Sequence, residues 1–157
     1  MHRTLLLAFA LAGCAEAPEP LNLTPSEAPF ALEAGATFYS DVAYGDDERQ
    51  VLDLFVPEGT GPFPIVFEVH GGGFVGGDED ALYEIEEGRA GIEEALAAGA
   101  AFANVEYRVL DEVDDEGVIK SLGDSRYALQ FLRWHAEELG LDGAHVVGRG
   151  HRRGRAP

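Results

Sequence analysis

Cysteine, basic residues and long apolar runs are all scarce in this sequence. Its 157 residues include one cysteine, Cys14, so no disulfide can form within the chain. Lys and Arg together number 11 against 29 acidic residues, which gives a formal net charge of −18. Nucleic acids and anionic membrane surfaces are bound by clustered basic residues, so this charge argues against both as partners of the body of the protein. A hydrophobic content of 46% nevertheless suffices for one domain with a core.

Acidic residues are missing from one end of the chain. The stretch from Ala144 to Pro157 has none, and it contains four arginines: Arg149, Arg152, Arg153 and Arg155. From Gly148 on, the chain uses only Gly, Arg, His, Ala and Pro, which GC-rich DNA encodes readily in any reading frame. We therefore interpret residues 148–157 as an aberrant tail, produced by a frame error or a truncation of a longer protein.

The N-terminus has the pattern of a targeting segment. Arg3 precedes an apolar run, Leu5 to Ala12, that is too short to span a bilayer but fits a secretory signal peptide over residues 1–13. Leu11-Ala12-Gly13-Cys14 resembles a bacterial lipobox, which implies a lipid on Cys14 and attachment to a membrane of the cell envelope. The alternative is an ordinary signal peptide in which Cys14 has no role. Residues 14–30 are rich in proline and are predicted to form a tether.

Residues 31–147 predict an α/β fold. Two strands, at 37–44 and 51–56, flank a turn and form an antiparallel hairpin, with Leu52, Leu54 and Val56 on one face. Strands near Ile65 and over Phe102 to Tyr107 then alternate with helices, and a short strand begins at His145. The first helix is predicted to end at Gly99. The second spans Ser121 to Leu139, with Ser121 and Asp124 as a capping box and His135 packed on its apolar face. Such alternation predicts crossover helices and a largely parallel sheet.

Three consecutive glycines follow the strand Ile65 to Val69. Gly71, Gly72 and Gly73 leave the backbone N–H groups open to a close approach. In acyl-transfer enzymes such groups bind the oxyanion of the tetrahedral intermediate. A plain glycine turn between strand and helix is the alternative.

Several stretches together resemble a known family. They are the hairpin, VFEVHGGGF at 66–74, YRVL at 107–110 and the helix from Asp124 to Leu132. They resemble the front half of an HGGG-type α/β-hydrolase, a group of carboxylesterases, hormone-sensitive-lipase-like esterases and feruloyl-esterase-like enzymes. The resemblance implies that Gly71 and Gly72 donate the oxyanion N–H groups, while His70 and Gly73 support the loop. It implies a structural ion pair or cap at Arg108 and Asp124, a small-molecule ester as substrate of the full-length form, and no cofactor or metal.

The family's nucleophile is missing from this sequence. In the family the next element ends in Gly-x-Ser-x-Gly, and the spacing places Gly150-His151-Arg152-Arg153-Gly154 there. Arg152 occupies the serine position, and a guanidinium is not a nucleophile. The Asp or Glu and the His that follow in the family are also absent. We therefore expect ester hydrolysis from the family and no triad chemistry from the chain as written.

Two alternatives remain open. One is a non-catalytic, acidic surface lipoprotein with a binding or structural role. Its acidic runs do not fit the EF-hand pattern, because Val113 occupies the third position after Asp111. The other is a fragment that does not fold stably, since half of a parallel sheet leaves a strand edge uncovered.

Overall fold

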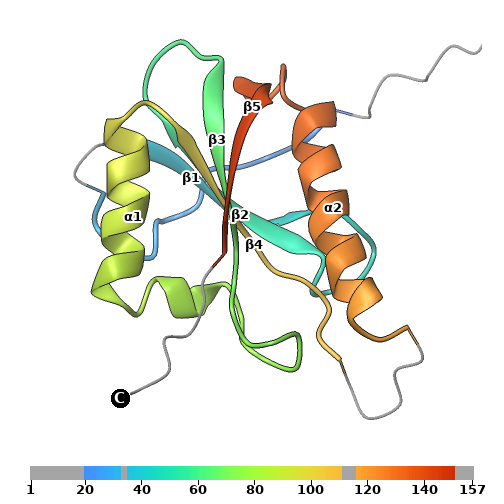
Figure 1. Cartoon of the computed structure of the whole chain (residues 1–157). Helices are drawn as coiled ribbons and strands as arrows, with labels where there is room; N and C mark the ends of the chain where they lie inside the picture. The colour runs from blue at the N-terminus through green and yellow to red at the C-terminus, as the bar shows by residue number, and fades with distance from the viewer. Residues whose placement is uncertain (1–19, 33–34, 111–115, 151–157) are drawn as a thin grey trace, which may run out of the picture.

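The computed structural model describes residues 20–32, 35–110 and 116–150. Five strands, two α-helices and one short 3-10 helix follow in chain order (Figure 1). They are β1 (Ala36–Ala43), β2 (Val51–Pro57), β3 (Phe63–Val69), η1 (Asp80–Leu82), α1 (Glu86–Ala97), β4 (Ala101–Val105), α2 (Val118–Trp134) and β5 (Leu141–Gly150).

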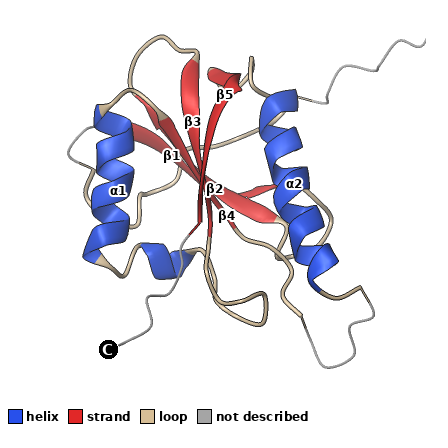
Figure 2. Cartoon of the chain, in the orientation of Figure 1, coloured by secondary structure: helices blue, strands red, loops and turns tan. Residues whose placement is uncertain are grey.

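The strands form one mixed sheet in the order β1-β2-β4-β3-β5. β1, β2 and β4 pair antiparallel, whereas β3 runs parallel to both β4 and β5. The chain leaves β3 toward one edge of the sheet through α1, and it leaves β4 toward the other edge through α2. The two helices therefore cover opposite faces of the sheet (Figure 2). The predicted α/β fold, a hairpin followed by parallel strands, is confirmed.

Each face of the sheet has its own hydrophobic core. On the α2 side, Leu52 and Leu54 pack with Leu132, as the alternation in the sequence predicted. On the α1 side, Phe55 packs with Ile92 and with partners that include Phe102, Leu82 and Leu96. Because β2 lies inside the sheet, its residues on both faces are buried.

The predicted capping box at the second helix is wrong. α2 begins at Val118, with Gly117 at the N-cap and no side-chain cap, so Ser121 and Asp124 lie within the helix. Both are buried and bond to Arg108 instead. A spacing of three residues places two side chains on one helix face as readily as it forms a cap, and the sequence does not separate the two cases.

Two other boundaries differ from the prediction. α2 ends at Trp134 rather than Leu139, and His135 lies just beyond it, buried against the ring of Phe131. β5 begins at Leu141 and continues to Gly150, so it is longer than the short strand expected at His145. Its last three residues pair with β3, because Phe67 faces Gly148 and Val69 faces Gly150.

The described part of the predicted tether lies against the domain. The amide of Ser26 donates to the Phe38 carbonyl oxygen at 2.8 Å, Leu23 packs on the α2-side core, and Phe30 packs on the α1-side core. Composition alone did not predict this docking, since proline-rich sequence is typical of linkers. The signal segment and Cys14 lie outside the described residues. Among the described helices, none combines the length and apolar character that crossing a membrane requires.

A matched pair of isoleucines tests the packing of the α1 side. Ile92→Ala removes a fully buried side chain, and we expect it to lower the free energy of unfolding by about 2–5 kcal/mol. Ile119→Ala makes the same change where the side chain is 74% exposed, and we expect an effect within about 0.5 kcal/mol. Urea denaturation followed by circular dichroism measures both, and equal losses would contradict the described packing.

Candidate functional site

The glycine loop turns sharply at the carboxyl end of β3. Gly72 and Gly73 have positive φ angles of +133° and +65°, and Phe74 follows at +68°. The amide of Val75 donates to the Gly72 carbonyl oxygen at 3.3 Å, which closes the turn. A Cβ atom on Gly72 would lie 1.7 Å from the carbonyl oxygen of Gly76, so only glycine fits there.

His70 braces this loop from below. Its ring stacks on Tyr107, with 4.1 Å between ring centroids, and the Tyr107 hydroxyl donates to the His70 carbonyl oxygen at 3.0 Å. The His70 Nδ1 lies 2.7 Å from the Gly71 carbonyl oxygen, and Nε2 lies 3.1 Å from Oε1 of Glu106. Both ring nitrogens therefore lie against oxygen atoms, one from the loop backbone and one from a carboxylate.

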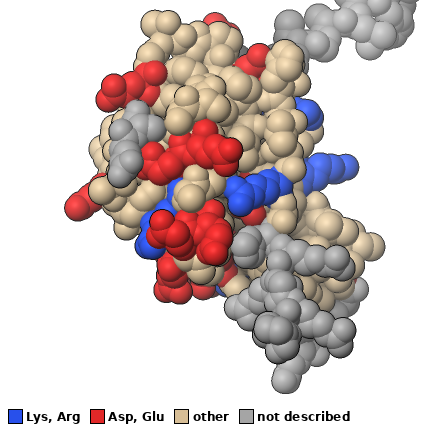
Figure 3. All heavy atoms as spheres, turned by 60° about the vertical axis from the view of Figure 1, so that its left-hand side comes forward, with Lys and Arg blue, Asp and Glu red and all other residues tan. Residues whose placement is uncertain are grey.

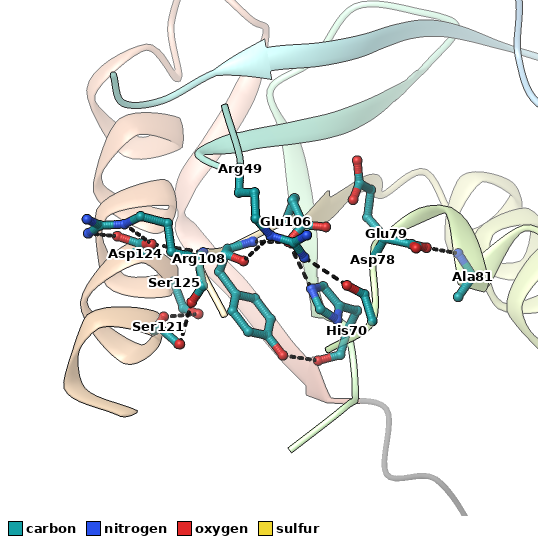
Figure 4. Close-up of polar contacts among 12 residues, drawn as sticks. Arg49, His70, Asp78, Glu79, Ala81, Glu106, Arg108, Ser121, Asp124 and Ser125 are labelled. Atoms are coloured by element: carbon teal, nitrogen blue, oxygen red, sulfur yellow. Dashed lines mark hydrogen bonds and ion pairs between the residues drawn. The ribbon is translucent and has the colours of Figure 1, made fainter. Parts of the chain in front are cut away.

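Glu106 is the acceptor at which these contacts meet. It follows β4, and its Oε1 accepts from His70, from the Tyr107 amide at 2.7 Å and from Nη2 of Arg49 at 2.7 Å (Figure 4). Arg49, from the hairpin, also donates to the Gly77 carbonyl oxygen at 2.7 Å. The hairpin, the end of β4 and both ends of the glycine loop are thereby joined through one carboxylate.

A second carboxyl group shares a proton with Glu106. Burial, together with the hydrogen bond to Glu106, raises the pKa of Glu79 to about 9. Burial alone would raise the pKa of Glu106 as well, but the hydrogen bonds with His70 and Glu79 lower it to about 2. At neutral pH, Glu79 is therefore the neutral donor and Glu106 the charged acceptor.

An ion pair fixes the segment that follows β4. The guanidinium of Arg108 donates to Asp124 through Nε at 2.8 Å and through Nη2 at 2.7 Å. Burial would raise the pKa of Asp124, but the hydrogen bonds with Arg108 and Gln50 hold it below its usual value. The predicted ion pair between Arg108 and Asp124 is present, and it links β4 to α2.

A row of polar side chains, two of them buried, lies on the α1 side of the sheet. Asn104, Glu68 and Arg149 stand in register on the three parallel strands. Glu68 is fully buried, and its Oε2 lies 3.3 Å from Nε of Arg149. The Arg149 guanidinium lies against Gly91 of α1, so a side chain at position 91 would require the guanidinium to move. Arg149 is thus an ion-pair partner of this buried carboxylate.

The structure brings together only part of the site that the sequence predicted. Gly71, Gly72, Gly73 and His70 lie at one edge of the sheet, and β5 ends beside them because Gly150 faces Val69. Arg152 lies outside the described residues. Two serines, Ser121 and Ser125, are in α2 and donate to backbone oxygens, and Ser26 and Ser40 lie in the N-terminal segment and in β1.

Sequence reasoning missed Arg49, Glu79 and Glu106. An acidic residue at the end of an apolar strand was a signal for Glu106, because a buried carboxylate needs partners. Arg49 lies in a hairpin turn rich in charged residues, and nothing in the sequence distinguished it from a solvated side chain.

Comparison with known proteins identifies the family. The family model BD-FAE matches residues 52–154, a range that includes the glycine loop, the Arg108 segment and β5. The chain belongs to the BD-FAE family. This family is an α/β-hydrolase-like esterase domain, so the resemblance predicted from the HGGG loop is confirmed. No curated protein matches the chain.

Solved structures of esterases share the fold of this BD-FAE chain. Esterase B from Lactobacillus rhamnosis is 23% identical with a TM-score of 0.61, and the match covers 78% of this chain and 38% of that one. A bacterial heroin esterase is 30% identical with a TM-score of 0.57, covering 78% of this chain and 37% of that one. A truncated carbohydrate esterase from gut microbiota is 19% identical with a TM-score of 0.58, covering 83% and 41%. The BD-FAE chain thus spans less than half the length of these esterases.

A matched pair of glycines tests the loop geometry. We expect Gly72→Ala to lower the free energy of unfolding by at least about 1 kcal/mol and to speed amide exchange across the loop, since its φ and the Gly76 oxygen both oppose a side chain. Gly76→Ala has open space around its Cβ position, and we expect wild-type exchange. Hydrogen exchange read by mass spectrometry distinguishes them, and identical profiles would contradict the described turn.

The shared proton predicts a dependence of stability on pH. The pKa of Glu79 is raised from 4.5 in the unfolded chain to about 9 in the folded chain, so the folded chain holds a proton that the unfolded chain releases. Its contribution is complete below pH 4.5 and is lost as the pH rises to about 9. Glu79→Gln keeps a donor to Glu106 without titrating, so we expect the fall in unfolding free energy between pH 5 and 9 to be smaller than in wild type.

The control for this experiment is Glu137→Gln, which removes an acid that is exposed beyond α2. We expect that variant to keep the wild-type slope. Urea melts at five pH values supply the slopes, and a slope unchanged by Glu79→Gln would show that no proton is taken up at this pair.

Proposed function

We propose that this BD-FAE chain is the oxyanion-binding half of a serine hydrolase of small carboxylic esters. Gly71 and Gly72 donate their N–H groups to the oxyanion of the tetrahedral intermediate. The observation that carries the proposal is the brace: His70, Glu106 and Arg49 hold both ends of the loop by hydrogen bonds. Within the described ranges, no acceptor is bonded to the amide of Gly71 or Gly72. Donors that are fixed before the reaction stabilise developing charge without reorganisation.

The brace also explains why His70 is not the catalytic base. A base needs a ring nitrogen that is open to the proton of the nucleophile, whereas the two ring nitrogens of His70 lie against the Gly71 carbonyl oxygen and the Glu106 carboxylate. His70 therefore positions the Gly71 carbonyl, and through it the peptide groups of the turn.

The nucleophile is the part that the chain as written lacks. In the intact hydrolase, a serine oxygen at position 152 attacks the ester carbonyl, the alcohol leaves, and water then releases the acid from the acyl-enzyme. Arg152 in its place forms no acyl-enzyme. A histidine that accepts the serine proton and a carboxylate to orient it would have to follow the matched residues, in the portion by which the related esterases are longer.

We also propose a position for the start of the altered end, on the basis of the contacts of β5. Gly148, Arg149 and Gly150 all pair with β3, and Arg149 contacts the buried carboxylate of Glu68. A residue read in a wrong frame is not expected to pair with a buried carboxylate on the neighbouring strand β3. We therefore place the change of frame after Gly150 rather than at Gly148.

The proposed location of the protein is the cell envelope. It rests on the signal-like segment and on Cys14, which would carry the lipid that attaches the chain to the membrane. The acidic surface of the domain, visible on the α1 side in Figure 3, makes the lipid rather than the protein surface the point of contact with an anionic membrane.

Two measurements test the function. We expect the chain as written to give no hydrolysis of p-nitrophenyl butyrate above buffer and no labelling by a fluorophosphonate. Labelling at any serine, located by mass spectrometry, would contradict the assignment of the nucleophile to position 152. Sequencing the DNA from codon 140 onward then shows whether another frame continues after Gly150 into Gly-x-Ser-x-Gly with a later Asp and His.

If such a frame exists, the corrected protein is expected to hydrolyse the ester and to take up one phosphonate. In that protein Gly72→Ala keeps the backbone N–H but displaces it, because its Cβ would collide with the Gly76 oxygen, and kcat should fall about 10²-fold, as when an oxyanion donor is lost. A corrected protein without activity would contradict the hydrolase, and a confirmed stop without a serine in any frame would leave the non-catalytic lipoprotein as the function.

A further inference from the structure

A cavity lies between the sheet and the segment that leads into α1. Its volume is about 290 Å³. Its floor is formed by Asn104 and Glu68, which are fully buried and face each other across β4 and β3. Leu82 and Ile85 line it with apolar surface, and Gly71 of the oxyanion loop forms part of its edge. The cavity therefore combines a polar floor with aliphatic walls.

The floor presents an acceptor that has no donor. The Asn104 Nδ2 group donates to the Glu79 carbonyl oxygen at 2.8 Å and to the Tyr83 hydroxyl at 3.1 Å. Exchanging the amide nitrogen and oxygen would set two acceptors, Oδ1 and the Glu79 carbonyl, against each other, so the orientation is fixed. The Asn104 Oδ1 atom is then buried without a hydrogen bond from any described residue. A buried acceptor of this kind costs free energy until a donor reaches it.

The charges around the cavity select the kind of donor. Its lining contains three carboxylates: Glu68 on the floor and Asp78 and Glu84 nearer solvent. None of the described lining residues is Lys or Arg. The nearby guanidinium groups already have carboxylate partners, since Arg49 contacts Glu106 and Arg149 contacts Glu68 from the β5 side. An anionic ligand is therefore excluded, and a cationic donor is favoured over a neutral one.

A bare metal ion does not fit this site. Among the described residues, no three side chains of His, Cys, Asp or Glu are arranged to hold one. The aliphatic walls also offer nothing to a hydrated ion, whereas they suit a short hydrocarbon chain.

We propose that this cavity binds a primary alkylammonium group. One N–H of the ammonium donates to Asn104 Oδ1, its charge lies against the Glu68 carboxylate, and its alkyl chain contacts Leu82 and Ile85. Neighbouring strands lie about 4.8 Å apart, so one ammonium can contact both floor residues. Because Gly71 forms the edge of the cavity, the same site would select esters that carry an ammonium group near the carbonyl. Only this selection of ester substrates rests on the proposed hydrolase function.

Four probes of equal chain length separate charge from hydrogen bonding. They are n-butylammonium, n-butanol, butyltrimethylammonium and butyrate, each titrated into the ¹⁵N-labelled protein at pH 7 and low salt. We expect n-butylammonium to shift the Asn104 side-chain amide and the amides of Gly71 and Gly77 in a saturable way. Butanol lacks the charge and butyltrimethylammonium lacks the N–H, so both are expected to bind at least tenfold more weakly, and butyrate should not bind.

Three glutamate variants locate the site. Glu68→Gln should weaken n-butylammonium binding at least tenfold, and Glu84→Gln, near solvent, about two-fold. Glu94→Gln removes an exposed acid of α1 that does not line the cavity, and we expect wild-type affinity. If Glu68→Gln fails to fold, Glu84→Gln and the four probes still decide the question.

Three results would overturn the proposal: no saturable shift with n-butylammonium, butanol or butyltrimethylammonium binding as tightly, or Glu84→Gln and Glu94→Gln behaving alike. These binding measurements require no turnover. A chain that binds n-butylammonium but hydrolyses no ester refutes only the hydrolase, and a corrected, active protein without ammonium binding refutes only this site.

Discussion

The carboxylate of Glu106 is the contact on which the loop side of the molecule depends. It accepts from His70, from Arg49 and from the Tyr107 amide, and these three groups come from different parts of the chain. Removing this carboxylate would leave the guanidinium of Arg49 without its counter-charge and the buried ring of His70 without its partner at Nε2. Breaking one member of a buried charged network costs more than the net value of the network, because the remaining charges stay desolvated.

The proton on Glu79 makes this arrangement possible at neutral pH. Two carboxylates so close together would repel each other, and burial sharpens that repulsion. With Glu79 neutral, the repulsion becomes a hydrogen bond, and the full negative charge is concentrated on Glu106, where His70 and Arg49 lie. The glycine loop is thus joined to this charged network at both ends, through His70 and Arg49.

The polar row of Asn104, Glu68 and Arg149 is a second layer below this network. Its members lie on the α1 face of three parallel strands, where the rest of that face is aromatic and aliphatic. Burying polar groups in such a row costs free energy unless each group has a hydrogen-bond or ion-pair partner. Arg149 is the ion-pair partner of Glu68, and its guanidinium lies against Gly91, so β5 is joined to β3 by an ion pair as well as by the strand pairing.

Local pattern accounts for the elements of the sheet. The alternation in β2, the glycine at the end of α1 and the glycine run after β3 each depend on a few neighbouring residues, so the sequence alone determined them. It also determined the resemblance to HGGG-type α/β-hydrolases and the arginine at position 152. Only the tertiary structure decided the contacts that join distant segments. The spacing of Ser121 and Asp124 suited a cap, but Arg108 makes them interior partners. Arg49 and Glu106 are 57 residues apart, and no local signal connects them. Their pairing follows from the strand order, which brings the hairpin and the end of β4 together at one edge of the sheet.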